Sequence, residues 1–164
     1  MGTGGLFLRK LRAKVSDEPT GFVWVEKDKL AGSGYPSSRG QLEWLVAQGI
    51  DSILTLTLRP LAKEWVAGLP LKLGHVAMQD HVAPEFDSLN LAVNFVREQA
   101  KAGKTVLVHC LAGEGRTGCV LAAYLMKEKG ISADDALRSL RKIKPTFVES
   151  AQERALKDYE SSLK

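Results

Sequence analysis

One stretch, residues 105–119, constrains the fold of this chain more than any other. It begins with the apolar and β-branched residues 105–108, which predict a short buried strand. It runs into residues 119–126, which are apolar on more than one face and contain neither glycine nor proline, so they predict a buried helix. A strand and a helix joined in this way are typical of α/β layer proteins.

The loop between this strand and this helix has the composition of a phosphate-binding site. Its glycines allow successive backbone N–H groups to converge on one point, and the following helix adds partial positive charge there. Arg116 offers a planar fork of donors that matches a phosphate dianion. Cys110 lies at the mouth of the loop, where a thiol loses its proton easily. A thiolate beneath a bound phosphoryl group can attack phosphorus and form a cysteinyl phosphate.

The pair His109-Cys110, five further residues and then Arg116-Thr117 resemble the H-C-x5-R-[ST] signature of cysteine-dependent protein tyrosine phosphatases. The span from about residue 24 to residue 159 is similar to the small, atypical dual-specificity branch of that superfamily. The resemblance implies a metal-independent phosphatase without a cofactor.

The same resemblance implies a role for each residue of the signature. Cys110 would be the nucleophile and Arg116 the phosphate clamp. Thr117 would donate a hydrogen bond to the cysteine sulfur and help it leave in the second step, and His109 would orient the loop. The residues expected to bind the phosphate of the substrate are Leu111, Ala112, Gly113, Glu114, Gly115, Arg116 and Thr117.

Asp80 is the candidate general acid. It follows a predicted strand at residues 71–78, and a carboxylic acid on such a loop can protonate the departing oxygen. The family places its catalytic aspartate on a separate loop upstream of the cysteine, as here. The alternative is a solvated turn residue or a helix cap. Asp87 is the substitute candidate, although it is better placed to start the next helix, and His81 is expected to help position the loop.

Two features of the family pattern have no clear counterpart in this sequence. Small members often carry an acidic residue just after the strand that we expect to end at Leu58, whereas this chain continues with arginine. If that acid fixes the phosphate loop, another group must do so here, and we expect Glu114 to do it. Some relatives orient the hydrolytic water with a glutamine near the start of the last helix. Gln152 and Glu149 both lie close to that place, and neither is assigned.

A rival interpretation uses the same residues. Residues 113–118 match G-x-G-x-x-G between a strand and a helix, which is the dinucleotide-binding fingerprint. That fingerprint requires a second strand with an acidic end about 20 residues later, whereas residues 132–144 predict a helix. A Walker loop is excluded because no Gly-Lys-[Ser/Thr] follows.

The composition fits one soluble domain with a substantial core. The chain has 164 residues, 45% of them hydrophobic and 26% charged, and a net charge of +4. Basic and acidic residues alternate without a long basic block, so nucleic acid is not the expected partner. No run approaches the ~20 apolar residues that span a bilayer, and no signal peptide is present. We therefore expect a cytoplasmic monomer without stable membrane insertion.

The two cysteines form neither a disulfide framework nor a zinc set. Cys119 is interpreted as a small core residue of the helix. A regulatory disulfide between Cys119 and Cys110 is the alternative, which the spacing leaves open. No metal ligand set is expected.

The order of predicted elements indicates an α/β fold. We expect three layers, with a mostly parallel central sheet of about five strands flanked by helices, as in protein tyrosine phosphatases. Residues 1–20 are expected to be an N-terminal extension. Their pattern is compatible with a short basic amphipathic helix on the domain or on a membrane, and packing on the domain or fraying is favoured over the membrane. Residues 21–164 would form the dual-specificity phosphatase-like catalytic domain. The remaining predicted elements are strands at 22–25, from 30 and at 53–58, and helices up to 49, at 61–67, at 86–101 and at 149–163.

The predicted substrate is a phosphorylated protein, with phosphotyrosine first and phosphoserine or phosphothreonine as further targets. The alternatives are RNA 5′-phosphate, a phosphoinositide, a phosphate-binding module without turnover, and a sulfur-transfer role for Cys110. Glu114 puts negative charge beside the pocket, which argues against a polyanionic lipid headgroup.

Overall fold

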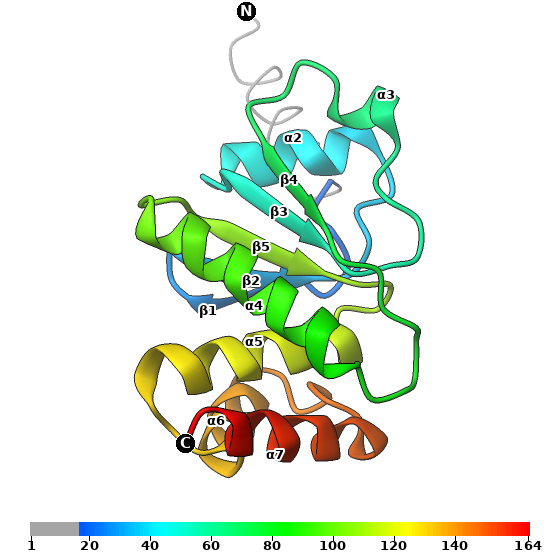
Figure 1. Ribbon diagram of the computed structural model, residues 1–164. Helices are drawn as coiled ribbons and strands as arrows, with labels where there is room; N and C mark the ends of the chain where they lie inside the picture. The colour runs from blue at the N-terminus through cyan, green and yellow to red at the C-terminus, as the bar shows by residue number, and fades with distance from the viewer. Residues whose placement is uncertain (1–16) are drawn as a thin grey trace, which may run out of the picture.

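The computed structural model describes residues 17–164 and shows one sheet between two sets of helices (Figure 1). The strands are β1 (Val23–Glu26), β2 (Leu30–Ser33), β3 (Ser52–Thr55), β4 (Lys72–His75) and β5 (Val106–His109). The helices are α2 (Arg39–Ala47), α3 (Lys63–Val66), α4 (Phe86–Lys101), α5 (Gly115–Lys129), α6 (Ala133–Ile143), the 3-10 turn η1 (Ser150–Gln152) and α7 (Glu153–Ser162). The helix expected near the N-terminus falls almost entirely on residues 1–16, outside the described residues.

The sheet has five strands in the order β1-β2-β5-β3-β4. Only the edge strand β1 is antiparallel to its neighbour, so the expected mostly parallel sheet is confirmed. The apolar strand β5 is hydrogen-bonded on both sides, and all four of its residues are buried, as is typical of parallel sheets covered on both faces. The register places His109 between Ser33 and Thr55. The chain that leaves β5 therefore emerges at the middle of the carboxyl edge, where α/β proteins bind ligands.

Helices cover both faces of the sheet, which gives the expected layers (Figure 1). The larger core lies between the sheet and α4 and α5, and the smaller core lies under α2 and α3. Helix α6 and helix α7 pack on α5, which explains why 12 of its 15 residues are buried. A helix enclosed in this way is apolar around most of its circumference, as the sequence predicted. None of the helices in residues 17–164 has the length and apolar character that crossing a membrane needs.

The helix boundaries follow local capping chemistry. Ser38 and Ser132 accept hydrogen bonds from backbone N–H groups in the first turns of α2 and α6, at 3.2 and 3.1 Å, as their sequences predict. Gly130 ends α5 with a left-handed φ of 64°. Helix α5 begins at Gly115 rather than at Cys119, so the first turn contains part of the glycine-rich segment.

The parallel strands are shorter than predicted at their carboxyl ends. Strand β3 ends at Thr55 rather than Leu58, and β4 covers Lys72–His75 rather than residues 71–78. Backbone hydrogen bonding continues past these ends, because the Met78 N–H still donates to the Leu56 carbonyl at 2.9 Å. The two chains then separate into the loops that approach the end of β5.

Candidate active site

Cys110 is the first residue after β5, and its side chain is 2% exposed. Residues 111–114 turn the chain, and α5 starts at Gly115. The first amides of an α-helix have no partner within the helix, so this turn provides donors for an anion, as expected.

Two glycines of the loop are required by its close packing. Gly113 has a φ of +77°, and a Cβ atom there would lie 2.4 Å from the backbone carbon of Ser33. A Cβ atom at Gly115 would lie 2.7 Å from the side-chain oxygen Oε1 of Gln152. The loop is therefore enclosed between the end of β2 and the segment before α7. A larger residue would clash with backbone at Gly113, and at Gly115 it would displace the Gln152 side chain.

The loop is fixed by contacts from distant parts of the chain. The Tyr35 N–H donates to the Leu111 carbonyl at 3.0 Å. The ammonium group of Lys144, next to the end of α6, donates to the carbonyls of Gly113 and Gly21, both at 3.2 Å. The Glu114 carboxylate has no hydrogen-bond partner in residues 17–164, although its backbone carbonyl accepts from two amides. The contact that we expected from the side chain of Glu114 is therefore supplied by Lys144.

His109 is a buried, neutral group beneath the loop. Its Nδ1 donates to the carbonyl of Cys110 at 3.2 Å, and its Nε2 accepts from the Thr55 hydroxyl at 2.7 Å. The pKa of His109 is lowered from 6.5 to about 4, mainly because burial disfavours the charged ring. The bond to the Cys110 carbonyl opposes this shift, and the positive charge of Arg116 contributes to it. A ring that is neutral and bonded at both nitrogens is suited to orienting the loop.

Arg116 lies in the first turn of α5 and is only 4% exposed. Its Nη1 donates to the Met78 carbonyl at 3.0 Å, and its Nη2 lies 3.3 Å from Oδ2 of Asp80. Its Nε is buried and has no partner among the described residues, and the same holds for the Thr117 hydroxyl. A buried charged donor without an acceptor is costly, so the guanidinium is arranged for an additional anionic acceptor.

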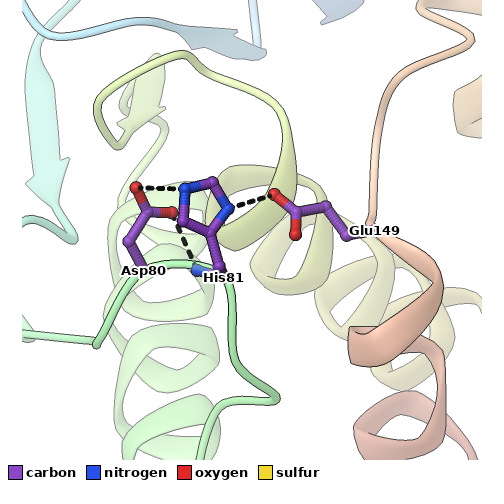
Figure 2. A group of neighbouring side chains, drawn as sticks. All are labelled: Asp80, His81 and Glu149. Carbon is purple, nitrogen blue, oxygen red and sulfur yellow. Dashed lines mark hydrogen bonds and ion pairs between the residues drawn. The ribbon is translucent and has the colours of Figure 1, made fainter.

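Asp80 lies on the loop after β4 and faces Arg116 through the ion pair described above. Its Oδ1 accepts from the His81 backbone N–H at 2.9 Å, and its Oδ2 lies 3.4 Å from His81 Nε2 (Figure 2). His81 Nδ1 in turn lies 3.0 Å from Oε1 of Glu149. The structure thus brings together Asp80 and Arg116, whereas Asp87 lies in the first turn of α4, as its sequence position suggested.

Gln152 is the residue that sequence reasoning left unassigned and that the structure places against the loop. Its side chain is fully buried, and its Oε1 accepts from the Glu149 N–H at 2.9 Å. Its Nε2 donates to the Val82 carbonyl at 3.4 Å, so Gln152 links the segment that precedes α7 to the Asp80 loop. The sequence does not fix which residue starts the last helix, because the tighter turn η1 precedes α7.

Asp80, His81 and Glu149 are also the described residues whose donor atoms lie near enough to hold a metal ion, all within 4.8 Å of one another. The guanidinium of Arg116 lies 3.3 Å from Asp80 Oδ2 and would repel a cation there. Both imidazole nitrogens already meet carboxylate oxygens. The arrangement therefore fits a link made of one hydrogen bond and one ion-pair contact better than a metal centre.

Cys119 is a core residue, as predicted. It is fully buried in α5, and burial raises the pKa of its thiol from 9.0 to about 12. Both cysteines are free thiols. A thiol that resists ionisation is a slow partner in disulfide exchange. This property of Cys119 does not favour the alternative of a regulatory disulfide with Cys110.

Comparisons with known proteins agree on one family. Residues 38–162 match the family described as dual specificity phosphatase, catalytic domain. The chain is 35% identical to phosphatidylglycerophosphate phosphatase PTPMT2 of Arabidopsis thaliana over 131 residues, which cover 74% of this chain and 55% of that protein. The chain thus spans about half the length of this relative.

Solved structures show the same fold. A mutant form of Tk-PTP aligns with a TM-score of 0.78 and 29% identity, over 87% of this chain and 95% of that chain. A structure of PTPMT1 in complex with PI(5)P aligns with a TM-score of 0.75 and 19% identity, over 87% of this chain and 96% of that chain. The second likeness concerns the fold alone. The order and packing of the elements thus agree with the predicted protein tyrosine phosphatase-like architecture.

The low pKa of His109 predicts a specific loss of stability in acid. Because the folded pKa is about 4 and the unfolded one 6.5, the unfolded chain binds a proton first as the pH falls. The contribution of neutral His109 to the free energy of unfolding is therefore fully present above about pH 6.5 and is lost as the pH falls from there to about 4. Relative to His109→Gln, wild type should lose on the order of 2 kcal/mol of unfolding free energy between neutral pH and about pH 4.5, as measured by urea denaturation. Parallel pH curves for the two proteins would contradict this explanation.

Removing the ammonium group of Lys144 should loosen the loop. Lys144→Met keeps the aliphatic stem but leaves the carbonyls of Gly113 and Gly21 without this donor. We expect a loss of about 1–3 kcal/mol in unfolding free energy and weaker inhibition by inorganic phosphate. Lys142→Met is the matched control, because Lys142 is exposed in the last turn of α6. Equal effects of the two substitutions would show that Lys144 does not support the loop.

Proposed function

The chain belongs to the family of dual specificity phosphatase catalytic domains, and from this premise we propose that it removes the phosphate monoester of a glycerophospholipid headgroup. Membership of the family makes it a cysteine-dependent phosphomonoester hydrolase. The observation that carries the proposal is the buried guanidinium of Arg116, with its Nε unpartnered in the described residues, on the loop that starts at Cys110.

In the first proposed step, the substrate phosphate enters the turn between β5 and α5. The loop amides and Arg116 hold its non-bridging oxygens. The Cys110 thiolate forms a bond to phosphorus as the bond from phosphorus to the leaving oxygen breaks. Asp80, which lies 3.3 Å from Arg116 Nη2, donates its proton to that oxygen.

In the second proposed step, water hydrolyses the cysteinyl phosphate. The Asp80 carboxylate accepts a proton from the water as its oxygen attacks phosphorus. The sulfur–phosphorus bond breaks, which releases inorganic phosphate and restores the thiolate. The Thr117 hydroxyl, which is buried without a partner in the described residues, is suited to donate to the departing sulfur. Gln152, packed against Gly115, is suited to orient the water.

Two observations support a lipid substrate over a protein. The relative from Arabidopsis thaliana, 35% identical to this chain, is named a phosphatidylglycerophosphate phosphatase. In addition, the loops that follow β3, β4 and β5 each carry a well-exposed large apolar side chain, respectively Leu58, Val82 and Leu111. Parallel strands end at the same edge, so these three side chains form an apolar rim on the edge of the sheet that carries the candidate site. Exposed apolar groups at such a rim favour an interfacial substrate.

Phosphotyrosine in a protein is the second candidate substrate. It is supported by a relative from Emericella nidulans, 25% identical to this chain over 113 residues, that is named a tyrosine-protein phosphatase. An enzyme that acts on phosphotyrosine meets its substrate in solution, whereas an enzyme that acts on a lipid must contact a membrane surface. The same apolar rim could receive the side chains that flank a phosphorylated residue.

Cys110→Ser should abolish turnover of an aryl phosphate, because a serine hydroxyl is a far weaker nucleophile than a thiolate. Acid quenching of the wild-type reaction should trap a protein whose mass is increased by one phosphoryl group. Cys119→Ala is the control and should retain activity, and chelation by EDTA should leave the wild-type rate unchanged. Turnover by the serine variant would reject the nucleophile assignment. A single burst without turnover in wild type would support a phosphate-binding module instead.

A direct comparison of substrates tests the lipid assignment. We expect phosphatidylglycerophosphate in vesicles to be hydrolysed with a kcat/KM at least about tenfold above that for phosphotyrosine peptides, inositol phosphates or RNA 5′-triphosphate, which corresponds to about 1.4 kcal/mol of transition-state binding. A preference for phosphotyrosine peptides would reverse the assignment to the protein substrate.

Two matched leucine substitutions test whether the apolar rim contacts the lipid surface or whether any exposed leucine has the same effect. Leu58 and Leu91 are 65% and 62% exposed, but Leu91 lies on α4. Leu58→Ser should lower activity on vesicles and spare a soluble aryl phosphate, whereas Leu91→Ser should affect neither. Equal behaviour of the two variants on vesicles would contradict contact between the rim and the lipid surface.

A further inference from the structure

The side chain of His81 connects two segments that are far apart in the sequence (Figure 2). Its Nε2 lies 3.4 Å from Asp80 Oδ2, and its Nδ1 lies 3.0 Å from Glu149 Oε1. The side chain is 75% exposed, so packing does not hold it in this place. The contact of Nδ1 with Glu149 is a hydrogen bond, and the contact of Nε2 with Asp80 is an ion-pair contact. The ring thus bridges the Asp80 loop and the segment that precedes α7.

The backbone at this point is held in an unusual conformation. His81 has a φ of 61°, in the left-handed region that residues with a Cβ atom rarely adopt. The Asp80 carboxylate accepts from the His81 backbone N–H at 2.9 Å, which ties the acid to this turn. Strain of this kind persists where the surroundings impose it and is concentrated at functional sites.

The other end of the bridge is anchored to the phosphate loop. Val148, which precedes Glu149, donates its N–H to the Glu114 carbonyl at 3.2 Å. The Glu149 N–H donates to Oε1 of the buried Gln152, which packs against Gly115. Glu149 therefore has a backbone position fixed relative to the loop that carries Arg116. Gln152 also reaches the Val82 carbonyl at 3.4 Å, which is a second link to the Asp80 loop.

We propose that His81 is a positioning residue that, through Glu149, holds the Asp80 carboxyl over the phosphate loop. This inference rests on the proposed function, because it assigns Asp80 the role of general acid. Arg116 contacts Asp80 as well, at 3.3 Å, but its guanidinium is the group that receives the phosphate. When a dianion engages the guanidinium, the contacts of His81 with Asp80 do not depend on Arg116 and keep Asp80 at the leaving oxygen.

The dependence of the rate on the leaving group tests this role. The phenolate of an aryl phosphate with an acidic phenol can leave without a proton from a general acid. The alkoxide of an alkyl phosphate needs that proton in order to leave. We expect His81→Asn to lower kcat for the alkyl phosphate by about 10- to 100-fold and to change kcat for the aryl phosphate by less than about twofold. Asparagine tolerates the left-handed backbone, so this substitution removes the imidazole with little change of backbone preference.

Companion variants distinguish positioning from a structural effect. Glu149→Ala should reproduce the selective loss, and Glu149→Gln, which retains the acceptor oxygen, should restore much of it. In an Asp80→Asn background, His81→Asn should have little further effect, because it acts through Asp80. His75→Asn is the matched control. His75 is exposed on β4, bonded to the Thr57 carbonyl at 2.8 Å, and its substitution should leave both rates unchanged.

The outcomes separate this inference from the proposed function. If wild type does not turn over the aryl phosphate, the proposed function fails. If wild type is active but His81→Asn lowers both rates equally, or lowers them further in the Asp80→Asn background, the positioning role is rejected and the phosphatase assignment stands. Selective loss with the alkyl phosphate, shared by Glu149→Ala, supports the bridge.

Discussion

The buried guanidinium of Arg116 is the group on which the site depends. A permanent positive charge with 4% exposure must be compensated, and the chain does so with the Met78 carbonyl and the Asp80 carboxylate. Both partners lie after β4, so their contacts draw that segment to the start of α5. The charge that would bind a phosphate thus also holds the candidate acid at the start of α5. The donor left over, Nε, has no acceptor in the described residues and accounts for the affinity that we propose for an oxyanion.

The surrounding scaffold serves to keep the loop in one shape. Strand β5 is bonded on both sides, so the position of Cys110 follows from the centre of the sheet. His109 stays neutral below the loop because burial lowers its pKa, and it can therefore bond to Thr55 and to the Cys110 carbonyl together. Lys144 reaches the loop from α6 and binds carbonyl oxygens. A cation thus fixes the loop through its backbone, which explains how this chain dispenses with the acidic residue that small relatives often carry after the strand.

The parts that the sequence predicted are those set by local patterns. The order of strands and helices and the full extent of α4 follow from residues within a few positions of each other. The start of α5 was misplaced because glycine is a poor helix former. Gly115 and Gly118 are needed there because Gln152 and the backbone of Val148 approach closely. The contacts of Lys144 and Glu149 with the site join residues 31 and 68 positions apart, and no local pattern carries such information.

The general acid in such a site must satisfy two opposing requirements. It needs to lie near the phosphate, yet the cation that holds it in the free enzyme is the one that the phosphate engages. A carboxyl held by Arg116 alone would lose its partner when the substrate arrives. His81 resolves this conflict because it contacts Asp80 from the side of Glu149, and Glu149 is fixed through Gln152 and the neighbouring backbone rather than through the guanidinium. The left-handed backbone of His81 occurs at the residue whose side chain contacts both carboxylates, as is typical of strained positions at functional sites.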